Sequence, residues 1–450
     1  MYPSVLYQAL ASAILAGEKS VESIVERCAA TLGREWPWLR PLAIRYTTTF
    51  ADWPRTRQIQ VANFLRSDPN LRKALETYAT AIRVRKWLSP PPKMQPAMVA
   101  RNWTIPPIET TGALADSLRL TVSELQWFAQ QKRLNATTES NSLAHYNYRI
   151  LQKRSGGFRL IEAPKSRLRE IQRTILAEIL NPIPVHPAVH GFRSGRSIRT
   201  FAAPHTGQRV VLRMDLSDFF ATFTRPRIRA FFRTAGYPEP VADLLGGLCT
   251  HTAPRSLWSH LLDRLKQEGK AGVELPAILE AKQIYSQPHL PQGAPTSPSL
   301  SNICFYRIDC RLRGIADSVG AVYSRYADDL GFSGGTEFER VVDRFSTLAA
   351  SILMEEGFRV SLRKTRVMRR GVRQHLAGLV LNDHVNIQRS DYDRLKAILT
   401  NCVRFGPESQ NRDHHPAFLQ HLLGRIAFIE SIAPARGSRL RAIFDRIDFA

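Results

Sequence analysis

Two segments place carboxylates at the ends of predicted β-strands, and this placement constrains the fold more than any other feature of the sequence. In RVVLRMDL, residues 209–216, side chains alternate between the two faces of a strand, which sets Asp215 near its end, opposite aliphatic residues. In AVYSRYADDLGFS, residues 321–333, β-rich arms surround a tight turn, which sets Asp328 and Asp329 at a hairpin tip. If the two strands are neighbours, three carboxylates converge although they lie far apart in the sequence.

Converging carboxylates repel one another and need a cation. Mg²⁺ suits them because it prefers oxygen ligands and usually retains waters and substrate phosphates. A pair of such ions can activate an attacking hydroxyl group and stabilise the leaving pyrophosphate in nucleotidyl transfer. The alternative is that Asp328 and Asp329 form an ordinary turn dipeptide, which is the commoner meaning of two adjacent aspartates when nothing else accompanies them.

The charge of the chain indicates what such a site acts on. Lysine and arginine together number 63, against 39 aspartates and glutamates, which gives a formal net charge of +24 at pH 7. A protein this basic usually neutralises a polyanion, and nucleic acid is the first candidate. An anionic membrane surface is the less favoured alternative, because the basic residues are spread along the chain and not collected in one amphipathic helix.

The location of the protein is inferred from what the sequence lacks. No apolar run is long enough to span a bilayer, and the first residues have helical hydrophobic spacing without the charged start of a signal peptide. The cysteines form no CxxC pair and no zinc-like cluster with histidine, so they fit reduced thiols. We therefore expect a cytoplasmic protein with no membrane partner.

Helical and mixed segments follow one another along the chain. Residues 1–88 are predicted to form a helical domain, in which Ser20 caps one helix and Gly33 ends it. Prolines concentrate in residues 89–108 and predict a stiff spacer. Mixed α/β patterning follows, and after residue 388 the chain is again predicted to be helical.

The segment LPQGAPTSPSLSN, residues 290–302, predicts a stiff loop that enters a helix. Gly293 permits a close backbone approach, prolines rigidify the loop, and Ser297 is expected to cap the helix. Behind two metal-binding strands, such a loop is suited to holding a template base and the incoming base. Taken by itself, the segment could also be an ordinary loop.

Together, MDLSDFF, QGAPTSP and YADD resemble the palm of reverse transcriptases, in the branch of bacterial retrons and group II introns. Other segments resemble further parts of that family, in the family's order, over roughly residues 110–450. They are KRSGGFRLIEAP (153–164, the fingers hairpin), HGFRSGRS (190–197, before the first catalytic aspartate), GFRVSLRKTRVM (357–368), HLAGLVLNDHVNI (375–387, the primer grip) and residues 422–447 (the end of the thumb).

The resemblance implies an α+β fold: a right-hand polymerase of fingers, palm and helical thumb, with an additional all-α N-terminal domain. That domain, with Trp36 and Trp38, is expected to bind the RNA or a partner protein, or else to pack on the fingers. The expected boundaries are 1–88 for the N-terminal domain, 89–108 for the linker, 109–208 for the fingers, 209–388 for the palm with part of the fingers and the primer-grip hairpin, and 389–450 for the thumb.

The resemblance also implies catalytic roles for four side chains. Asp215 and Asp328 would be direct ligands of two Mg²⁺ ions, with Asp329 in a supporting position. Lys364 would protonate the departing pyrophosphate, or would simply bind phosphate backbone together with its arginine neighbours.

Substrate-binding residues follow from the same resemblance. Phe220 would stack under the sugar and exclude a 2′-OH, the alternative being a core aromatic such as Phe219. Arg159 would grip the triphosphate, with Lys165 a weaker candidate, unless both belong to a solvated hairpin face.

Further implied contacts involve the base pair and the nucleic-acid strands. Gln292 and Gly293 would touch the nascent base pair, whereas Tyr326 and Ala327 would flank the primer terminus. Three residues of one loop would meet template phosphates, or else lie on an ordinary surface loop: His190, Arg193 and Arg196.

Two elements usually described for retron enzymes are missing. No N-A-x-x-H sequence occurs, since LNATTES, residues 134–140, carries glutamate where histidine should be, and Leu376-Ala377-Gly378 stands at the V-T-G position. These departures weaken the expectation of a branched RNA–DNA product primed from a guanosine 2′-OH. They leave the catalytic residues intact.

The sequence therefore predicts an RNA-directed DNA polymerase that copies a dedicated noncoding RNA in a retron-like antiphage defence system. Its expected ligands are Mg²⁺, dNTPs, the RNA template with its primer and the RNA–DNA hybrid, and an effector protein is a further candidate partner. The alternatives are a non-retron defence-associated reverse transcriptase with different priming, and an RNA-binding chaperone on a polymerase scaffold. RNA-templated RNA synthesis is disfavoured because Phe220 should reject ribonucleotides.

Overall fold

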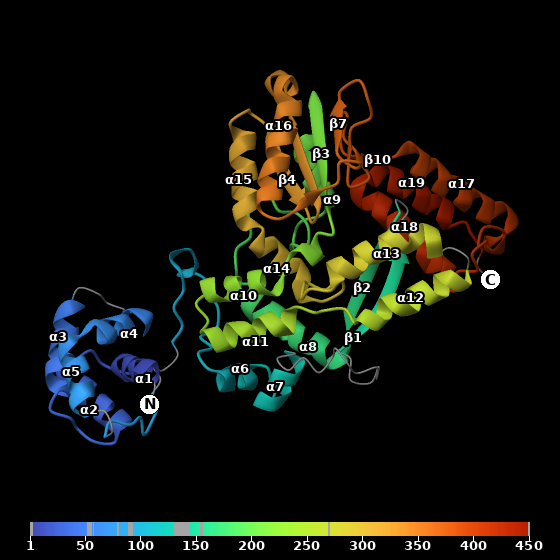
Figure 1. Ribbon diagram of the computed structural model, residues 1–450. Helices are drawn as coiled ribbons and strands as arrows, with labels where there is room; N and C mark the ends of the chain where they lie inside the picture. Colours follow the sequence, from blue (N-terminus) through green and yellow to red (C-terminus); the bar gives the residue numbers. More distant parts are fainter. Residues whose placement is uncertain are drawn as a thin grey trace. The chain divides into compact units, whose positions relative to one another are not determined.

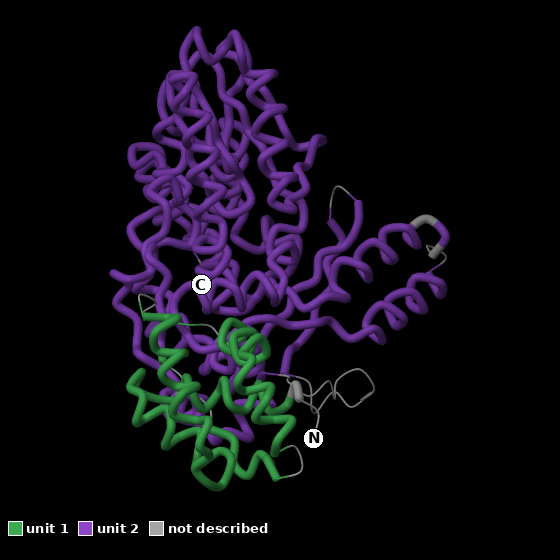
Figure 2. Tube along the Cα trace, turned by 60° about the vertical axis from the view of Figure 1, so that its left-hand side comes forward, with its two compact units in different colours: residues 1–93 green, residues 94–450 purple. Residues whose placement is uncertain are grey.

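The computed structural model describes most of the chain, in two compact units, residues 1–93 and 94–450 (Figures 1 and 2). The described residues are 3–51, 56, 58–78, 81–88, 93–129, 145–153, 156–268 and 271–448. The three consecutive prolines at 90–92 and the LNATTES segment therefore lie outside the described residues.

The first unit is helical and has a hydrophobic core of its own. Ser20 accepts a hydrogen bond from the backbone N–H of Ser23, and Gly33 ends the same helix with φ 83°, so both predicted boundaries are confirmed. Trp36 and Trp38 belong to the buried core of this unit. Its helices are α1 (Pro3–Leu15), α2 (Val21–Leu32), α3 (Leu39–Thr49), α4 (Gln58–Ser67) and α5 (Pro69–Thr77).

The second unit is built on an antiparallel sheet, so that the chain has the predicted α+β fold. The order of the sheet is β4-β5-β3-β6, and β7 also pairs with β3. The strands are β3 (Val210–Ser217), β4 (Val322–Tyr326), β5 (Asp329–Gly334), β6 (Arg359–Val360) and β7 (Arg366–Arg369).

Strand β3 is buried on both faces. Val210, Leu212 and Met214 pack in the main core, against which α16 (Thr336–Glu355) lies. Val211, on the opposite face, packs in a second core formed with the C-terminal helices. Both faces are covered because helices lie on one side of the sheet and C-terminal elements on the other (Figure 1).

A β-hairpin and short helices make up the segment predicted as fingers. Strands β1 (Tyr146–Gln152) and β2 (Phe158–Pro164) pair antiparallel, and the turn between them uses Gly156 and Gly157 with φ 85° and 80°. A capping box of Thr121 and Glu124 begins α7 (Val122–Phe128). The helices are α6 (Thr111–Ser117), α7 (Val122–Phe128), α8 (Ser166–Ile175) with a π-helical turn η3 (Leu176–Leu180), and α9 (Ile198–Ala202) with a 3₁₀ turn η4 (Ala203–His205).

Between β3 and β4 the chain is helical. The pair α12 (Arg255–Gln267) and α13 (Ala271–Tyr285) packs against β2 through Trp258 and Tyr285, and this helical hairpin was not predicted from the sequence. The other helices of this part are α10 (Arg225–Thr234), α11 (Glu239–Cys249), α14 (Thr296–Cys304) and α15 (Tyr306–Asp317), together with a 3₁₀ turn η5 (Phe220–Thr222).

Residues 94–108, predicted as part of the spacer, pack on the second unit. Backbone N–H groups of Gln95 and Ala97 donate to the carbonyls of Gly236 and Thr234, and Ile108 is buried. The prolines keep this segment irregular, and its backbone hydrogen bonds and buried apolar residues anchor it. A 3₁₀ turn, η1, spans Met98–Ala100.

The C-terminal part consists of a small three-stranded sheet and three packed helices, as predicted for this region. No helix in the described ranges is long and apolar enough to cross a bilayer. The strands are β8 (His375–Leu376), β9 (Leu379–Val380) and β10 (Asn386–Ile387). The helices are α17 (Arg389–Phe405), α18 (Phe418–Ile432) and α19 (Pro434–Phe444), with a 3₁₀ turn η6 (Pro407–Ser409).

Candidate active site

The three predicted carboxylates lie on two neighbouring strands. Asp215 is in direct register with Asp329, and the backbone N–H of Leu216 donates to the Asp328 carbonyl at 3.0 Å. Strands β4 and β5 are joined by a two-residue turn, Ala327 and Asp328, in which Ala327 has φ 55°. The strands are therefore adjacent, which is the condition that the predicted convergence required.

Burial and mutual repulsion disturb the acidity of this group. Burial raises the pKa of Asp328 to about 6, and the neighbouring charges of Asp329 and Asp215 add to the rise. Burial also raises the pKa of Asp329, although the Arg213 guanidinium opposes it. Burial and mutual repulsion thus destabilise the charged forms of these carboxylates.

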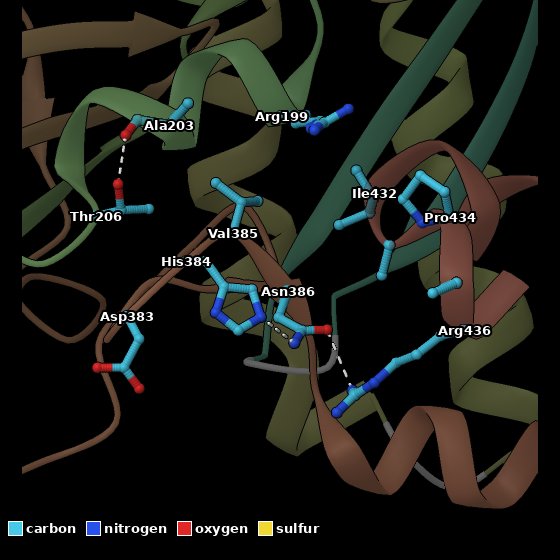
Figure 3. Close-up of a pocket in the computed structure, with 12 residues that line it drawn as sticks. Arg199, Ala203, Thr206, Asp383, His384, Val385, Asn386, Ile432, Pro434 and Arg436 are labelled. Carbon is cyan, nitrogen blue, oxygen red and sulfur yellow. Dashed lines mark hydrogen bonds between the residues drawn. The ribbon is translucent and has the colours of Figure 1, made fainter.

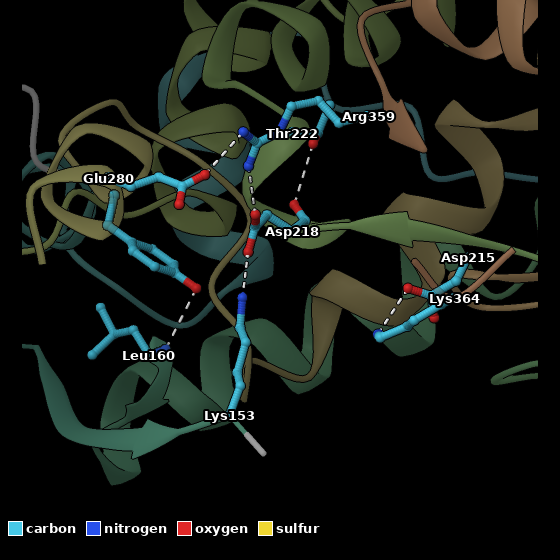
Figure 4. A network of polar contacts seen from close by, with 9 residues as sticks. Lys153, Leu160, Asp215, Asp218, Thr222, Glu280, Arg359 and Lys364 are labelled. Atoms are coloured by element: carbon cyan, nitrogen blue, oxygen red, sulfur yellow. Dashed lines mark hydrogen bonds and ion pairs between the residues drawn. The ribbon is translucent and has the colours of Figure 1, made fainter. Parts of the chain in front are cut away.

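Two of the carboxylates have cationic partners. The Lys364 Nζ atom donates to Asp215 Oδ1 at 2.8 Å (Figure 4), and Arg213 Nη2 lies 2.7 Å from Asp329 Oδ1. The Arg213 contact was missed in the sequence, although its position two residues before Asp215 on the same strand face was a usable signal. Asp328 has no cation in direct contact among the described residues.

The donor set suits a divalent cation even though it is not preassembled. Within the described ranges, no three His, Cys, Asp or Glu side chains already gather as metal ligands. Nevertheless, Asp215 and Asp328 offer hard oxygen donors close together, and the raised pKa of Asp328 reports uncompensated charge that a cation would neutralise. The residues therefore fit Mg²⁺, with Asp329 held aside by Arg213.

A cleft of about 710 Å³ opens beside the carboxylates and contains most of the predicted substrate residues. Asp215 does not line the cleft, but it accepts a hydrogen bond from Lys364, whose side chain does line the cleft. Gly293, Lys165 and the 190–196 loop residues His190, Arg193 and Arg196 are also absent from its walls. The predicted residues in the lining are Arg159, Phe220, Gln292, Tyr326, Ala327, Asp328, Asp329 and Lys364.

Aromatic rings form one wall of the cleft. Phe219 is buried in the core, whereas Phe220 is partly exposed, and the two ring centroids lie 5.5 Å apart. Phe192, which was not among the predicted site residues, lies 6.1 Å from Phe220 and 6.2 Å from Tyr326 between ring centroids. Phe220 is thus the ring of the pair that a bound nucleotide can reach.

A chain of ion pairs also lines the cleft (Figure 4). Asp218 accepts from Lys153 Nζ at 3.0 Å and from Arg359 Nη2 at 2.8 Å. Arg359 also donates to Glu280 at 3.0 Å. Lys153 and Arg359 were missed because nothing local in the sequence distinguishes them from other basic residues, yet they add two cations to the cleft beside Arg159.

The 290–302 loop is anchored to the fingers hairpin by backbone contacts. The N–H of Glu162 donates to the Gln292 carbonyl at 2.9 Å. Gly293 has φ 132°, and a Cβ atom there would lie 2.9 Å from the Glu162 carbonyl oxygen, so the predicted close approach is present. Lys165 lies at the N-cap position of α8, outside the cleft.

Ser297 does not cap α14, contrary to the prediction. The N-cap residue is Pro295, and Ser297 lies inside the first turn, where its hydroxyl donates to the Pro291 carbonyl at 2.8 Å. The serine therefore closes the loop on itself. The helix begins earlier than expected because Pro295 already has the helical conformation.

His190 does not have the exposed position that a phosphate contact requires. It is 5% exposed, and its Nδ1 lies 2.9 Å from the Thr200 hydroxyl. Burial lowers the pKa of His190 to about 4, so the ring is neutral at pH 7, which corrects the predicted role. Arg196 is exposed, whereas Arg193 is partly buried.

A buried ion pair lies directly behind the aspartate turn. Arg325 and Asp309 are both fully buried, with Nη2–Oδ2 and Nε–Oδ1 distances of 2.8 Å. Tyr323 also donates to Asp309 at 2.7 Å. Arg325 Nη1 in turn donates to the Ala327 carbonyl at 3.2 Å and to Asn302 Oδ1 at 3.1 Å. The pair thus supports the turn that carries Asp328, a role that the sequence did not reveal.

A second cleft, of about 590 Å³, lies where the predicted primer grip meets the C-terminal helices (Figure 3). Arg436 Nη1 donates to Asn386 Oδ1 at 3.1 Å, and His384 contacts the amide of Asn386. Arg199 projects toward the same space from α9. This cleft extends the polar and basic surface between the predicted palm and thumb.

Comparison with known proteins identifies a matching protein family and several similar proteins. Residues 151–390 match the protein family described as "Reverse transcriptase (RNA-dependent DNA polymerase)". The chain is 40% identical to the Retron Mx65 reverse transcriptase of Myxococcus xanthus over 66% of this chain and 63% of that protein. It is 35% identical to the Retron Mx162 reverse transcriptase of the same organism over 73% of this chain and 65% of that protein.

These matches cover less than two thirds of either relative's length. Among solved structures, a foamy viral protease-reverse transcriptase in complex with double-stranded DNA is 15% identical and covers 90% of this chain and 59% of that one. Its TM-score is 0.32, too low for a structural comparison of the two sites.

Proposed function

Since this chain belongs to the reverse transcriptase family, we propose that it is an RNA-directed DNA polymerase. The observation that carries the proposal is the register of β3 with β5, which sets Asp215 beside Asp329 and next to the turn that holds Asp328. This carboxylate group borders a cleft of about 710 Å³ that has aromatic and basic walls. Such a cleft suits a nucleotide, which brings a base to stack, a sugar and an anionic triphosphate.

The chemistry that we propose is two-metal nucleotidyl transfer. Two Mg²⁺ ions, when bound, would activate the primer hydroxyl and neutralise charge on the leaving pyrophosphate. Asp215 and Asp328 would hold them, while Asp329 stays paired with Arg213 and orients the turn. Lys364 balances the charge of Asp215 in the free protein, and its position in the cleft allows it to donate a proton to pyrophosphate.

Substrate selection would be divided among the cleft walls. Arg159 and Lys153, from the fingers hairpin, would bind the triphosphate, because guanidinium and ammonium groups donate to phosphate oxygens. Phe220, supported by the buried Phe219, would stack under the sugar and exclude a 2′-OH. Gln292 and Tyr326 would contact the nascent base pair and the primer end.

We further propose that the template is a dedicated noncoding RNA and that the protein acts in the cytoplasm, in a retron-like antiphage system with an effector partner. The names of the Myxococcus xanthus relatives support a retron connection. A second candidate is a defence-associated reverse transcriptase with different priming. The sequence Leu376-Ala377-Gly378 favours it, because it replaces the element expected of retron enzymes.

A primer-extension assay tests the catalytic proposal. The purified protein is given Mg²⁺, labelled dNTPs and either a primed generic RNA or its own co-purified RNA. We expect incorporation that requires RNA and disappears in an Asp328→Asn, Asp329→Asn double variant. An Asp343→Asn variant, which removes an exposed carboxylate from α16, should keep full activity. If the wild type incorporates nothing on either RNA, the RNA-binding chaperone becomes the better interpretation.

A further inference from the structure

A basic and aromatic strip lies on the first unit, in the part of the chain that precedes the sheet. Residues 82–88 follow α5 without helical structure, and the N–H groups of Arg85 and Lys86 donate to the Thr31 carbonyl at 2.8 and 3.2 Å. These bonds fix the segment beside the C-terminal end of α2. The strip is therefore a defined surface, which we call the 82–88 strip.

The aliphatic side chains of the strip lie against the core, and its basic and aromatic side chains lie in solvent. Ile82 is buried and Val84 and Leu88 pack against the core of the first unit, whereas Arg83, Arg85 and Trp87 are exposed. Lys86 is exposed as well. Two guanidinium groups, one ammonium group and one indole ring thus reach solvent within five consecutive residues.

Further groups extend this surface. The aliphatic part of the Arg85 side chain packs on Gly33, where an added Cβ atom would lie 2.8 Å from Arg85 Cγ. Arg34 directly follows Gly33 in the chain. Arg34 stacks over the Trp36 ring at 3.7 Å, and Trp36 contacts the exposed Tyr78 ring at 5.2 Å between centroids.

The cations of the strip are not neutralised by the protein. Among the described residues, no carboxylate lies within ion-pair distance of Arg34, Arg83, Arg85 or Lys86. Glu35 is the one acidic residue in the adjoining 34–38 segment, and it is exposed. Over residues 1–93, lysines and arginines outnumber aspartates and glutamates two to one. The cations of this surface are therefore free to contact an anionic ligand.

We propose that the 82–88 strip is a second nucleic-acid site, which binds single-stranded RNA outside the catalytic cleft. The arginines and Lys86 would contact phosphates, and Trp87 would stack on a base, as in single-strand binding surfaces generally. Among the tryptophans that the structure describes in the first unit, Trp87 is half exposed, whereas Trp36 and Trp38 are buried. The choice of RNA over DNA rests on the proposed function, whereas the site itself does not.

Fluorescence anisotropy on the full chain tests the proposal, with a labelled 20-nucleotide oligouridylate as the probe. An Arg83→Gln, Arg85→Gln, Lys86→Gln variant should bind it at least about tenfold more weakly, and the slope of log affinity against log salt should fall by about 2, since each lost phosphate contact removes about 0.7. Trp87→Ala should weaken binding about tenfold with little change in that slope.

The matched control is Arg66→Gln, Arg72→Gln, Lys73→Gln, which removes the same charge from exposed positions on α4 and α5 of the same unit. It should change affinity less than twofold. Equal losses in both triple variants would overturn the proposal, because the effect would then be one of net charge. Equal loss for oligouridylate and oligodeoxythymidylate would overturn the assignment to RNA.

Crosslinking locates the contact independently. Oligouridylate that contains 4-thiouridine should crosslink to a peptide containing Trp87, and crosslinks confined to residues 94–450 would refute the site. Primer extension on oligo(dT)-primed poly(rA) at saturating template should stay within twofold of wild type in the strip variants. If the wild type shows no primer extension, the proposed polymerase function is contradicted, and the binding measurements alone then test the 82–88 strip.

Discussion

The buried pair of Arg325 and Asp309 allows a sharp test of how the aspartate turn is held. In Asp309→Asn the side chain keeps its shape but loses its charge, so the Arg325 guanidinium remains fully buried without a counter-ion. It also loses charged acceptors for two hydrogen bonds of 2.8 Å. Removing one partner of such a buried pair costs about 3–5 kcal/mol. That is a large part of the about 5–15 kcal/mol by which domains are stable.

The same helix supplies the control. Asp317, at the end of α15, pairs with Arg313 at 2.7 Å, but both side chains are about half exposed. Asp317→Asn should therefore cost no more than about 0.5 kcal/mol, the usual contribution of an exposed pair four residues apart on a helix. Urea unfolding followed by circular dichroism compares the two variants. A cost below about 1 kcal/mol for Asp309→Asn would refute the argument from burial.

Activity separates support of the turn from stability alone. Because Arg325 donates to the Ala327 carbonyl, loss of its anchor should displace Asp328. Primer extension per folded molecule should then fall about tenfold to a hundredfold, the effect expected when a catalytic group moves by about 1 Å. Asp309→Leu combined with Arg325→Met should recover more than half of the stability but not the activity. Full activity in that double variant would show that the pair does not position the turn.

Three other predictions concern the cleft. Because the folded pKa of Asp328, about 6, exceeds that of an ordinary carboxyl, the charged form destabilises the metal-free fold, and stability is lost as pH rises toward 6. Asp328→Asn should thus raise metal-free stability at pH 7 by about 3 kcal/mol, with no gain below pH 4, and Mg²⁺ should stabilise the wild type but not the variant in thermal unfolding. In Gly293→Ala the added Cβ atom would lie 2.9 Å from the Glu162 carbonyl oxygen, and φ 132° is strained for alanine. The variant should therefore lose about 1–3 kcal/mol of stability and have a raised KM for dNTPs. An unchanged KM would contradict the role of the loop. Phe220→Ala should increase ribonucleotide incorporation relative to dNTPs in single-nucleotide extension, and no gain would remove Phe220 from the role of sugar gate.

The parts of the site that the sequence predicted are those with local signals. Alternation along β3 and the short turn between β4 and β5 are readable within a dozen residues, and they placed Asp215, Asp328 and Asp329 correctly on adjacent strands. The glycine at 293 was equally readable, because a close backbone approach requires a residue without a Cβ atom.

The parts that the sequence did not predict depend on contacts between distant segments. Arg213 meets Asp329, and Arg325 meets Asp309, only after strands and helices have packed. The alternation along β3 places Arg213 on the face of Asp215 but does not name Asp329 as its partner, and nothing near Arg325 distinguishes it from a solvent-facing charge. His190 lies in a loop rich in arginine and glycine, yet neighbouring elements bury it. Polar composition therefore predicted exposure where packing produced the opposite.

The place of β3 in the middle of the sheet also affects how the protein is made. Each strand that pairs with β3 follows it in the sequence, starting with β5 at Asp329. At typical synthesis rates, about 6–25 s pass between the emergence of β3 and that of β5 from the ribosome. During that interval β3 has two unpaired edges and hydrophobic side chains on both faces, which is a hazard for aggregation. Chains truncated before residue 329 should accordingly depend on chaperones or precipitate, and Asp215, Asp328 and Asp329 come together only late in translation.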